Sequence, residues 1–256
     1  MTIEYIVLLF TIGFIGSLLS GMLGIGGAIV KYPLLLMIPP LFGFQALTAH
    51  EVSGISALDV LFVSMAGVLG FRKGGLLNRS LIAVMGISVL FGTIIGSFGS
   101  SILPESAVNI VYGILSLLAA IMMFIPKQEE PQLQEVTFNK PLAAILAFLV
   151  GIGSGIVGAG GGFLIIPILL LVFRIPTHMA IASSLAITLI SSIAGSAGKI
   201  LTGQVNYSVA IIIILAGIIA APIGAKISQK LNTRALQSIL AALILVTTIK
   251  IWIDLL

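Results

Sequence analysis

Apolar runs of membrane-spanning length alternate with short polar stretches along the whole chain. Five runs occupy the first half and five the second, with approximate bounds 3–23, 26–41, 45–71, 79–101 and 105–125, then 141–158, 160–174, 177–200, 206–227 and 233–254. Runs of about 20 apolar residues are typical of helices that cross a bilayer. The pattern therefore predicts an all-α polytopic membrane protein.

The polar stretch 126–140 divides these runs into two sets. It reads PKQEEPQLQEVTFNK and holds three of the eight acidic residues of the chain. Proline and charge at this density are typical of an exposed connection. We therefore predict an N-terminal transmembrane repeat at 1–125, a cytoplasmic linker at 126–140 and a C-terminal transmembrane repeat at 141–256.

The two halves repeat each other at the level of single residues. At a separation of 134 positions, Gly21, Gly24, Gly26, Gly27 and Pro33 match Gly155, Gly158, Gly160, Gly161 and Pro167, and at 128 positions Gly75, Asn78 and Gly96 match Gly203, Asn206 and Gly224. Glycine-rich apolar sequence can match itself by chance, but here a proline and an asparagine also keep register. Such internal repeats are typical of transporters whose site lies between the repeats.

Basic residues indicate that the repeats are inverted. In the first half they gather between the third and fourth runs, as Arg72, Lys73 and Arg79. In the second half they gather between the fourth and fifth runs, as Lys226, Lys230 and Arg234. The connection between the third and fourth runs of the second half holds only Lys199. Basic connections tend to stay in the cytoplasm. Equivalent connections then lie on opposite sides of the membrane, and both termini are extracytoplasmic.

The second run of each half is too short to cross the bilayer. Runs 26–41 and 160–174 hold about 15 residues, which is roughly 22 Å of helix against a hydrocarbon thickness of ~30 Å. We predict that each forms a hairpin with the run before it and turns at its glycine cluster near the midplane. Backbone without helical hydrogen bonds is tolerated at that depth only inside the protein or beside a polar cavity.

Glycine turns of this kind can bind an anion. Glycine adopts positive φ without a steric penalty, and amide groups at the start of a helix favour negative charge. The candidate substrate-binding residues are Gly24, Gly26, Gly27 and Ala28 in the first turn and Gly158, Gly160, Gly161 and Gly162 in the second. The alternative use of glycine is close helix packing, for which the pairs Gly92–Gly96 and Gly151–Gly155 have the usual spacing.

Polar side chains beside the hairpins extend the candidate substrate site. Ser184, Thr188 and Ser191 fall on one face of the run 177–200. Their hydroxyls can donate to an anion, and they can equally join helices. Lys31 follows the first glycine cluster, where the second half has Ile165, and would add a positive charge.

Three ionisable residues lie in the run 45–71 and are candidates for proton coupling: His50, Glu51 and Asp59. Ionisable groups within a membrane segment are costly and usually functional, and a histidine beside a glutamate can relay protons near neutral pH. The alternative is a structural ion pair of Glu51 or Asp59 with the lysine of the first hairpin. To compare this run with the equivalent run of the second half, we align Ala49 with Ala182.

Composition excludes several other classes of protein. Hydrophobic residues make up 59% of the chain, charged residues 8%, and the mean hydropathy is +1.28. The net charge of +4 forms no patch with aromatic residues, so we expect no nucleic-acid partner. With no cysteine and no histidine cluster, we expect no metal site and no cofactor. An intramembrane enzyme using Ser154, His178 and Asp59 would leave the duplicated turns unexplained.

The two hairpin sequences resemble one known family. GIGGAIVKYPLLL at 24–36 and GAGGGFLIIPILLL at 158–171 are similar to the duplicated motif of the sulfite exporter TauE/SafE family, and the resemblance spans essentially the whole chain. It implies a secondary transporter in a prokaryotic inner membrane that moves a small sulfur-containing anion, such as sulfite, sulfoacetate or thiosulfate, by alternating access. Coupling to protons and assembly as a homodimer stay open, and an anion or small-solute channel is the alternative.

Overall fold

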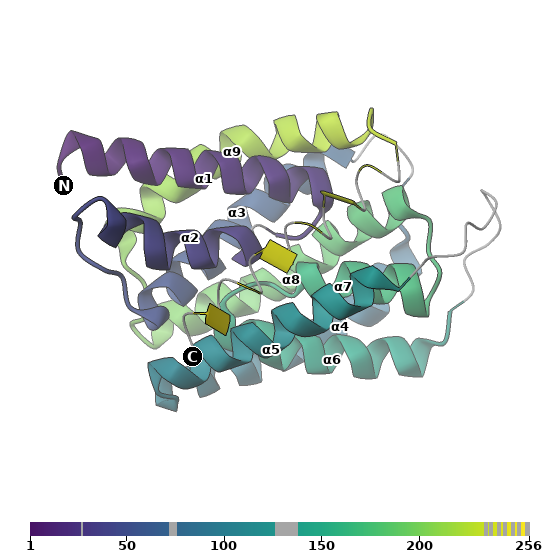
Figure 1. The fold of residues 1–256 in the computed structure, drawn as a ribbon. Helices are drawn as coiled ribbons and strands as arrows, with labels where there is room; N and C mark the ends of the chain where they lie inside the picture. Colours follow the sequence, from purple (N-terminus) through teal and green to yellow (C-terminus); the bar gives the residue numbers. More distant parts are fainter. Residues whose placement is uncertain are drawn as a thin grey trace.

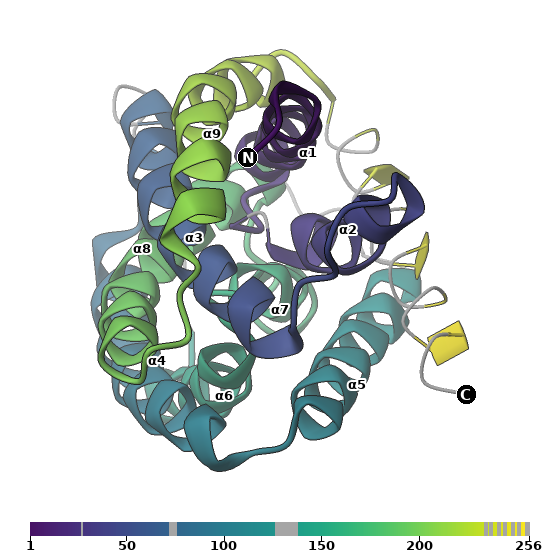
Figure 2. The same ribbon diagram turned by 90° about the vertical axis from the view of Figure 1, so that its left-hand side faces the viewer.

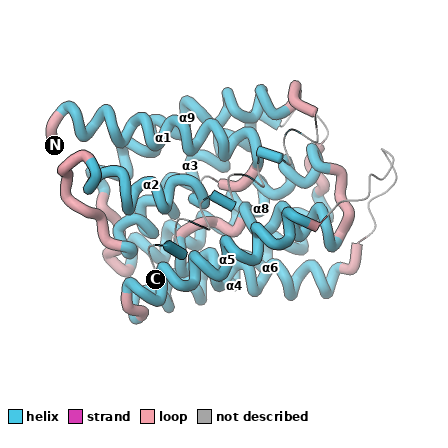
Figure 3. The backbone as a smooth tube through the Cα atoms, in the orientation of Figure 1, coloured by secondary structure: helices cyan, strands magenta, loops and turns pink. Residues whose placement is uncertain are grey.

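The computed structural model describes residues 1–26, 28–71, 76–125 and 138–232, together with scattered positions between 235 and 253. Over these residues the regular elements are helices (Figure 3). They are α1 (Ile3–Leu23), α2 (Ala28–Leu41), α3 (Ala49–Phe71), α4 (Arg79–Gly99), η1 (Ser100–Ile102), α5 (Glu105–Phe124), α6 (Lys140–Val157), α7 (Gly162–Pro167), η2 (Ile168–Val172), α8 (Thr177–Leu201) and α9 (Tyr207–Ser228).

Within the described residues, seven helices are long and apolar enough to cross a membrane, whereas the apolar stretches Ala28–Leu41 and Gly162–Val172 are shorter. The prediction of an all-α polytopic membrane protein is confirmed, and the helix bounds lie within a few residues of the apolar runs. The second stretch is irregular, because α7 contains Pro167 and continues as the π-helix η2. The predicted linker and the run 233–254 lie largely outside the described residues.

Asparagines start the two helices that the repeat pattern matches. Asn78 accepts a hydrogen bond from the amide of Leu81 at 3.0 Å, and Asn206 accepts one from the amide of Val209 at 3.4 Å. Each side chain therefore satisfies one of the amides that a helix start leaves unpaired. The asparagine match at 128 positions marks the equivalent starts of α4 and α9.

Glycines end α1 and α6 and form the predicted hairpin turns. Gly24 and Gly158 are the caps, with φ of 73° and 76°, and the amide of each donates to the carbonyl of the serine four residues earlier. Gly26 and Gly160 also have positive φ, at 75° and 64°. A residue with a Cβ rarely adopts this left-handed conformation, which explains the clusters.

Close helix packing joins the two halves of the chain. α1 packs along α9, and α4 packs along α6 (Figure 1). A Cβ added to Gly92, Gly96, Gly151 or Gly155 would collide with the backbone of the facing helix. The packing role that the small-residue spacing indicates for these four glycines is confirmed.

Contacts along these helices also give their directions. Gly13 of α1 lies against Ile213 of α9, and Gly21 lies against Ala221, so the two helices run parallel. By the same comparison α6 runs parallel to α4. α3 and α8 run antiparallel instead: Ala57 of α3 bonds to Ser196 of α8, and Gly67 lies against Leu185.

The helices of the bundle fall into two sets of opposite direction, with α1, α3 and α9 in one set and α4, α6 and α8 in the other. α3 runs parallel to α9, because Glu51 bonds to Asn206 at the start of both helices while Asp59 lies beside Gly217 further along. We call the end of the bundle at which α1, α3 and α9 begin the N-terminal end, which is on the left in Figure 1. In the end-on view of Figure 2, α7 lies near the middle of the bundle.

The outer surface of the bundle is apolar. Large side chains such as Ile87 and Phe91 of α4 and Ile211 and Leu215 of α9 are more than half exposed. Exposed apolar area on this scale is unfavourable in water and favourable in a bilayer. The surface therefore agrees with a protein that is embedded in lipid.

Candidate functional site

The two glycine turns touch each other inside the bundle. A Cβ added to Gly162 would lie 2.9 Å from the carbonyl of Ile25, and one added to Gly26 would lie 3.6 Å from the carbonyl oxygen of Ala159. The described residues of both turns are buried. The hairpins of the two halves therefore meet at one place, with Ala28 beginning α2 beside it; Gly27 lies outside the described residues.

The same two side chains cover both turns. A Cβ on Gly26 would lie 2.9 Å from Thr188 Cγ2 and 3.2 Å from Val60 Cγ1. On Gly160 the corresponding distances would be 2.8 Å and 2.7 Å. Val60 of α3 and Thr188 of α8 therefore occupy equivalent places, one on each side of the contact.

This pairing corrects our alignment of the two halves. A Cβ on Gly24 would touch the carbonyl oxygen of Ile181, and one on Gly158 would touch that of Ser53. Ser53 and Ile181 are 128 positions apart, as are Val60 and Thr188.

The alignment of Ala49 with Ala182 is therefore wrong by five positions. Its cause is chain length, because α2 and its connection to α3 are longer than the stretch between the second turn and α8. In the correct register, His50 of the first half corresponds to His178 of the second half. This match was visible in the sequence.

The three hydroxyl groups of the predicted stripe have different surroundings. Ser184 Oγ lies 2.9 Å from the carbonyl oxygens of Gly24 and Ile181, so it ties α8 to the first turn. Ser191 Oγ lies 2.7 Å from Thr93 Oγ1 and joins α8 to α4. These two serines thus have structural partners.

Thr188 differs from both serines. Its hydroxyl is fully buried and has no hydrogen-bond partner among the described residues. The oxygen faces the meeting point of the turns, 2.7 Å from where a Cβ on Gly162 would be. An unsatisfied buried hydroxyl is unfavourable unless something else supplies the missing hydrogen bond.

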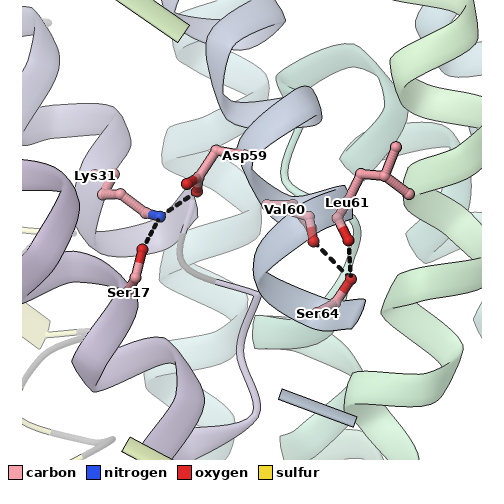
Figure 4. A network of polar contacts seen from close by, with 6 residues as sticks. All are labelled: Ser17, Lys31, Asp59, Val60, Leu61 and Ser64. Carbon is pink, nitrogen blue, oxygen red and sulfur yellow. Dashed lines mark hydrogen bonds and ion pairs between the residues drawn. The ribbon is translucent and has the colours of Figure 1, made fainter. Parts of the chain in front are cut away.

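A buried ion pair lies between the first hairpin and α3 (Figure 4). Lys31 Nζ contacts Asp59 Oδ2 and donates to Ser17 Oγ at 2.7 Å, and the lysine and the aspartate are each 1% exposed. The second carboxylate oxygen of Asp59 has no partner among the described residues and faces Gly217 of α9. Of the two ion pairs considered for Lys31, the structure contains the one with Asp59.

The second half has no counterpart of this ion pair. Ile165 stands 134 positions after Lys31, and Ile187 stands 128 positions after Asp59. Both isoleucines are fully buried. Two apolar side chains therefore stand at the equivalent positions of the second half. Packing alone does not require a charged pair there.

His50 and Glu51 lie apart from Asp59, at the start of α3. Glu51 forms a capping box with Thr48: the amide of Thr48 donates to Glu51 Oε2 at 2.9 Å, and the amide of Glu51 donates to Thr48 Oγ1 at 3.1 Å. Asn206 also donates to Glu51 Oε1. Asp59 is eight residues further along, about 12 Å of helix.

A polar cluster surrounds Lys199, which the sequence did not single out as a site residue. This lysine is fully buried and donates to Ser100 Oγ at 2.7 Å, to Gln204 Oε1 at 2.8 Å and to the carbonyl of Ile156 at 2.9 Å. We assigned it to a connection because it ends an apolar run. The burial of Lys199 depends on its packing against α4 and α6. No local sequence pattern reveals that packing.

Two members of the hypothetical enzyme triad are bound to other groups. Ser154 Oγ donates to the carbonyl of Gly151 at 3.2 Å, within its own helix. The carboxylate of Asp59 forms an ion pair with Lys31. The buried turns and the helices of membrane-spanning length define a polytopic membrane protein.

The chain belongs to the sulfite exporter TauE/SafE family, whose sequence model matches residues 9–251. It is 24% identical over 252 residues to a protein of Bacillus subtilis named Probable membrane transporter protein YunE, covering 91% of this chain and 92% of that one. It is 30% identical over 245 residues to a protein of Xylella fastidiosa named Probable membrane transporter protein, covering 91% and 88%. A third protein of that description, from Methanocaldococcus jannaschii, is 27% identical over 93% of this chain and 91% of its own. No solved structure matches the chain significantly.

Proposed function

We propose that the protein is a secondary transporter that moves a small sulfur-containing oxyanion or organosulfonate across the prokaryotic inner membrane, with the anion held where the two glycine turns meet. The observation that carries this proposal is the buried hydroxyl of Thr188, which faces that meeting point without a partner among the described residues. An oxygen of the anion would accept its hydrogen bond.

The backbone of the second turn supports the same ligand chemistry. Among the described residues, no group accepts a hydrogen bond from the amides of Gly160 and Gly161. Amide and hydroxyl donors without internal acceptors suit a ligand that only accepts, such as sulfite or a sulfonate group. The predicted site residues of the turns, with Thr188, form this proposed site.

We propose that alternating access arises from two inverted repeats, at 1–125 and 141–256. The opposite directions of α1 and α6, of α3 and α8, and of α4 and α9 support this arrangement. Related repeats can exchange their packing around a site on the axis between them, and so open it to each side in turn. Both termini would lie on the extracytoplasmic side.

We propose Asp59 as the group that couples transport to protons. Protonation of Asp59 would release Lys31 from its ion pair, so that the lysine becomes a positive charge for the anion beside the first turn. The absence of this pair from the second half supports a functional role, since a pair needed for folding would be expected in both. His50 and Glu51 already have partners at the start of α3.

Flux through reconstituted protein tests the proposed function. We expect the purified chain in liposomes to take up radiolabelled sulfite saturably, and to take it up faster when unlabelled sulfite is loaded inside. A channel would give flux that neither saturates nor responds to the internal anion. If neither sulfite, thiosulfate, sulfoacetate nor taurine moves, the proposed substrate class is wrong.

Thr188→Val tests the anion site. Valine keeps the shape of threonine and removes only the unsatisfied hydroxyl, so the variant should be as stable as the wild type or more stable by about 1 kcal/mol. Sulfite affinity should fall about tenfold, as expected for the loss of one hydrogen bond to a charged group. Thermal unfolding and calorimetric titration with sulfite measure the two quantities.

Thr93→Val is the matched control. It removes a hydroxyl of the same kind, but one that already bonds to Ser191 across the interface between α4 and α8. We expect a loss of stability with unchanged sulfite affinity. Equal affinities for sulfite in the wild type and in Thr188→Val would remove Thr188 from the site.

A further inference from the structure

Three polar groups converge on a single neutral oxygen at the N-terminal end of the bundle. That oxygen is Gln204 Oε1, which lies 2.8 Å from Lys199 Nζ, 3.2 Å from His50 Nδ1 and 3.3 Å from Ser100 Oγ. These groups come from α8, α3 and the junction of α4 with η1, whereas Gln204 belongs to the connection between α8 and α9.

The charges around this oxygen are positive. Lys199 is fully buried, and its recorded partners are neutral; the described residues give it no carboxylate. His50 Nε2 lies 3.1 Å from the carbonyl oxygen of Leu103, so each ring nitrogen of His50 faces an oxygen atom. A buried cation without a counter-charge is unfavourable, so Lys199 makes the place favourable for an anion.

The nearby carboxylates are bound elsewhere. Glu51 bonds to Thr48 and Asn206, and Glu105 accepts a hydrogen bond from the amide of Ala49 at 3.0 Å. Both therefore hold helix starts together rather than neutralise Lys199. Within the described part of the chain, the cluster therefore consists of one lysine and neutral polar groups, without a carboxylate.

At the equivalent positions of the first half, apolar residues replace the lysine and the glutamine of this cluster. At a separation of 128 positions, Phe71 has the position equivalent to that of Lys199, and Leu76 has the position equivalent to that of Gln204. Gly203 and Asn206 flank Gln204 and match Gly75 and Asn78, which fixes the register here. The lysine and the glutamine of the cluster therefore have no polar counterpart at these two positions.

Its place in the fold connects it to the turns. Lys199 also donates to the carbonyl of Ile156, two residues before Gly158. The second hairpin enters from the opposite end of the bundle, so the cluster lies between its tip and the N-terminal end. An anion that moves from the turns toward this end would meet Lys199 next.

We propose that the place now filled by Gln204 Oε1 is a second oxyanion site, which the cargo occupies on its way between the turns and the N-terminal end. This inference rests on the proposed function. In the closed arrangement the amide oxygen of Gln204 takes the place of an anion oxygen. When the connection between α8 and α9 moves outward, Lys199 and His50 lose their contact with Gln204 and face the cargo instead.

Two substitutions at Gln204 test the inference. Gln204→Glu ties a permanent carboxylate to Lys199, so the protein should unfold at a higher temperature, and the KM for sulfite uptake into liposomes should rise at least tenfold. Gln204→Ala removes the internal competitor, so KM should stay equal or fall. The two variants are therefore expected to change KM in different ways.

Controls separate this site from a general effect of charge. Lys226→Met removes an exposed lysine of α9 and should leave KM unchanged, whereas Lys199→Met should raise it. Wild-type KM in Gln204→Glu, equal effects of both Gln204 substitutions, or a Gln204→Glu variant that does not fold would each overturn the inference. Absence of uptake by the wild-type protein would instead refute the proposed function.

Discussion

The double variant Lys31→Ile with Asp59→Ile is expected to fold as well as the wild-type chain and to lose proton-driven transport. The second repeat supplies the precedent, because Ile165 and Ile187 fill the equivalent places and are fully buried. Replacing a buried ion pair with apolar side chains of similar volume is often neutral or stabilising. Function should be lost because neither a protonatable group nor a releasable cation is left beside the first turn.

Single substitutions at the pair should behave in the opposite way. Asp59→Ile leaves the Lys31 ammonium buried without its counter-charge, and Lys31→Ile leaves the carboxylate. Each should cost about 3–5 kcal/mol of the free energy of unfolding, as is usual when one partner of a buried pair is removed. Ser17, which accepts a hydrogen bond from Lys31 at 2.7 Å, cannot replace the lost charge.

Denaturant unfolding in detergent and sulfite flux under an imposed pH gradient measure the two effects. A double variant that is stable and still responds to the gradient as the wild type does would make the ion pair structural. A double variant that is as unstable as the single ones would show that the first hairpin needs the charges for its fold. Only stability without coupling supports the role proposed for Asp59.

Much of the fold could be predicted from the sequence because its signals are local. Apolar runs give the spanning helices, the asparagines Asn78 and Asn206 mark helix starts, and Gly24 and Gly158 mark turns through their positive φ. Each of these depends on a few neighbouring residues. The bounds of the described helices follow from them with small errors.

The candidate site could be predicted only in outline, since its chemistry depends on partners from other helices. Ser184, Thr188 and Ser191 look alike in the sequence, yet only Thr188 faces the turns without a partner among the described residues. Glu51 looked like a proton carrier, but its spacing from Thr48 was also the local signature of a capping box. Lys199 becomes buried only when the bundle has assembled.

Gly162→Ala is expected to abolish transport with a moderate loss of stability. The added Cβ would lie 2.7 Å from Thr188 Oγ1 and 2.9 Å from the carbonyl of Ile25, so the two turns would have to separate. Overpacking of this kind typically costs about 1–3 kcal/mol. Gly162 gives a cleaner test than Gly161, where φ of 78° makes any side chain strained whatever the space.

Gly99→Ala is the matched control, because it lies at the end of α4 and an added Cβ there has no atom within 4 Å among the described residues. It should transport at the wild-type rate and be equally or slightly more stable, as expected when alanine replaces glycine in a helix. If Gly162→Ala transported sulfite at the rate of this control, the contact between the turns would not be the substrate site. A loss of sulfite binding in Gly162→Ala with at most a moderate loss of stability would place the anion at that contact.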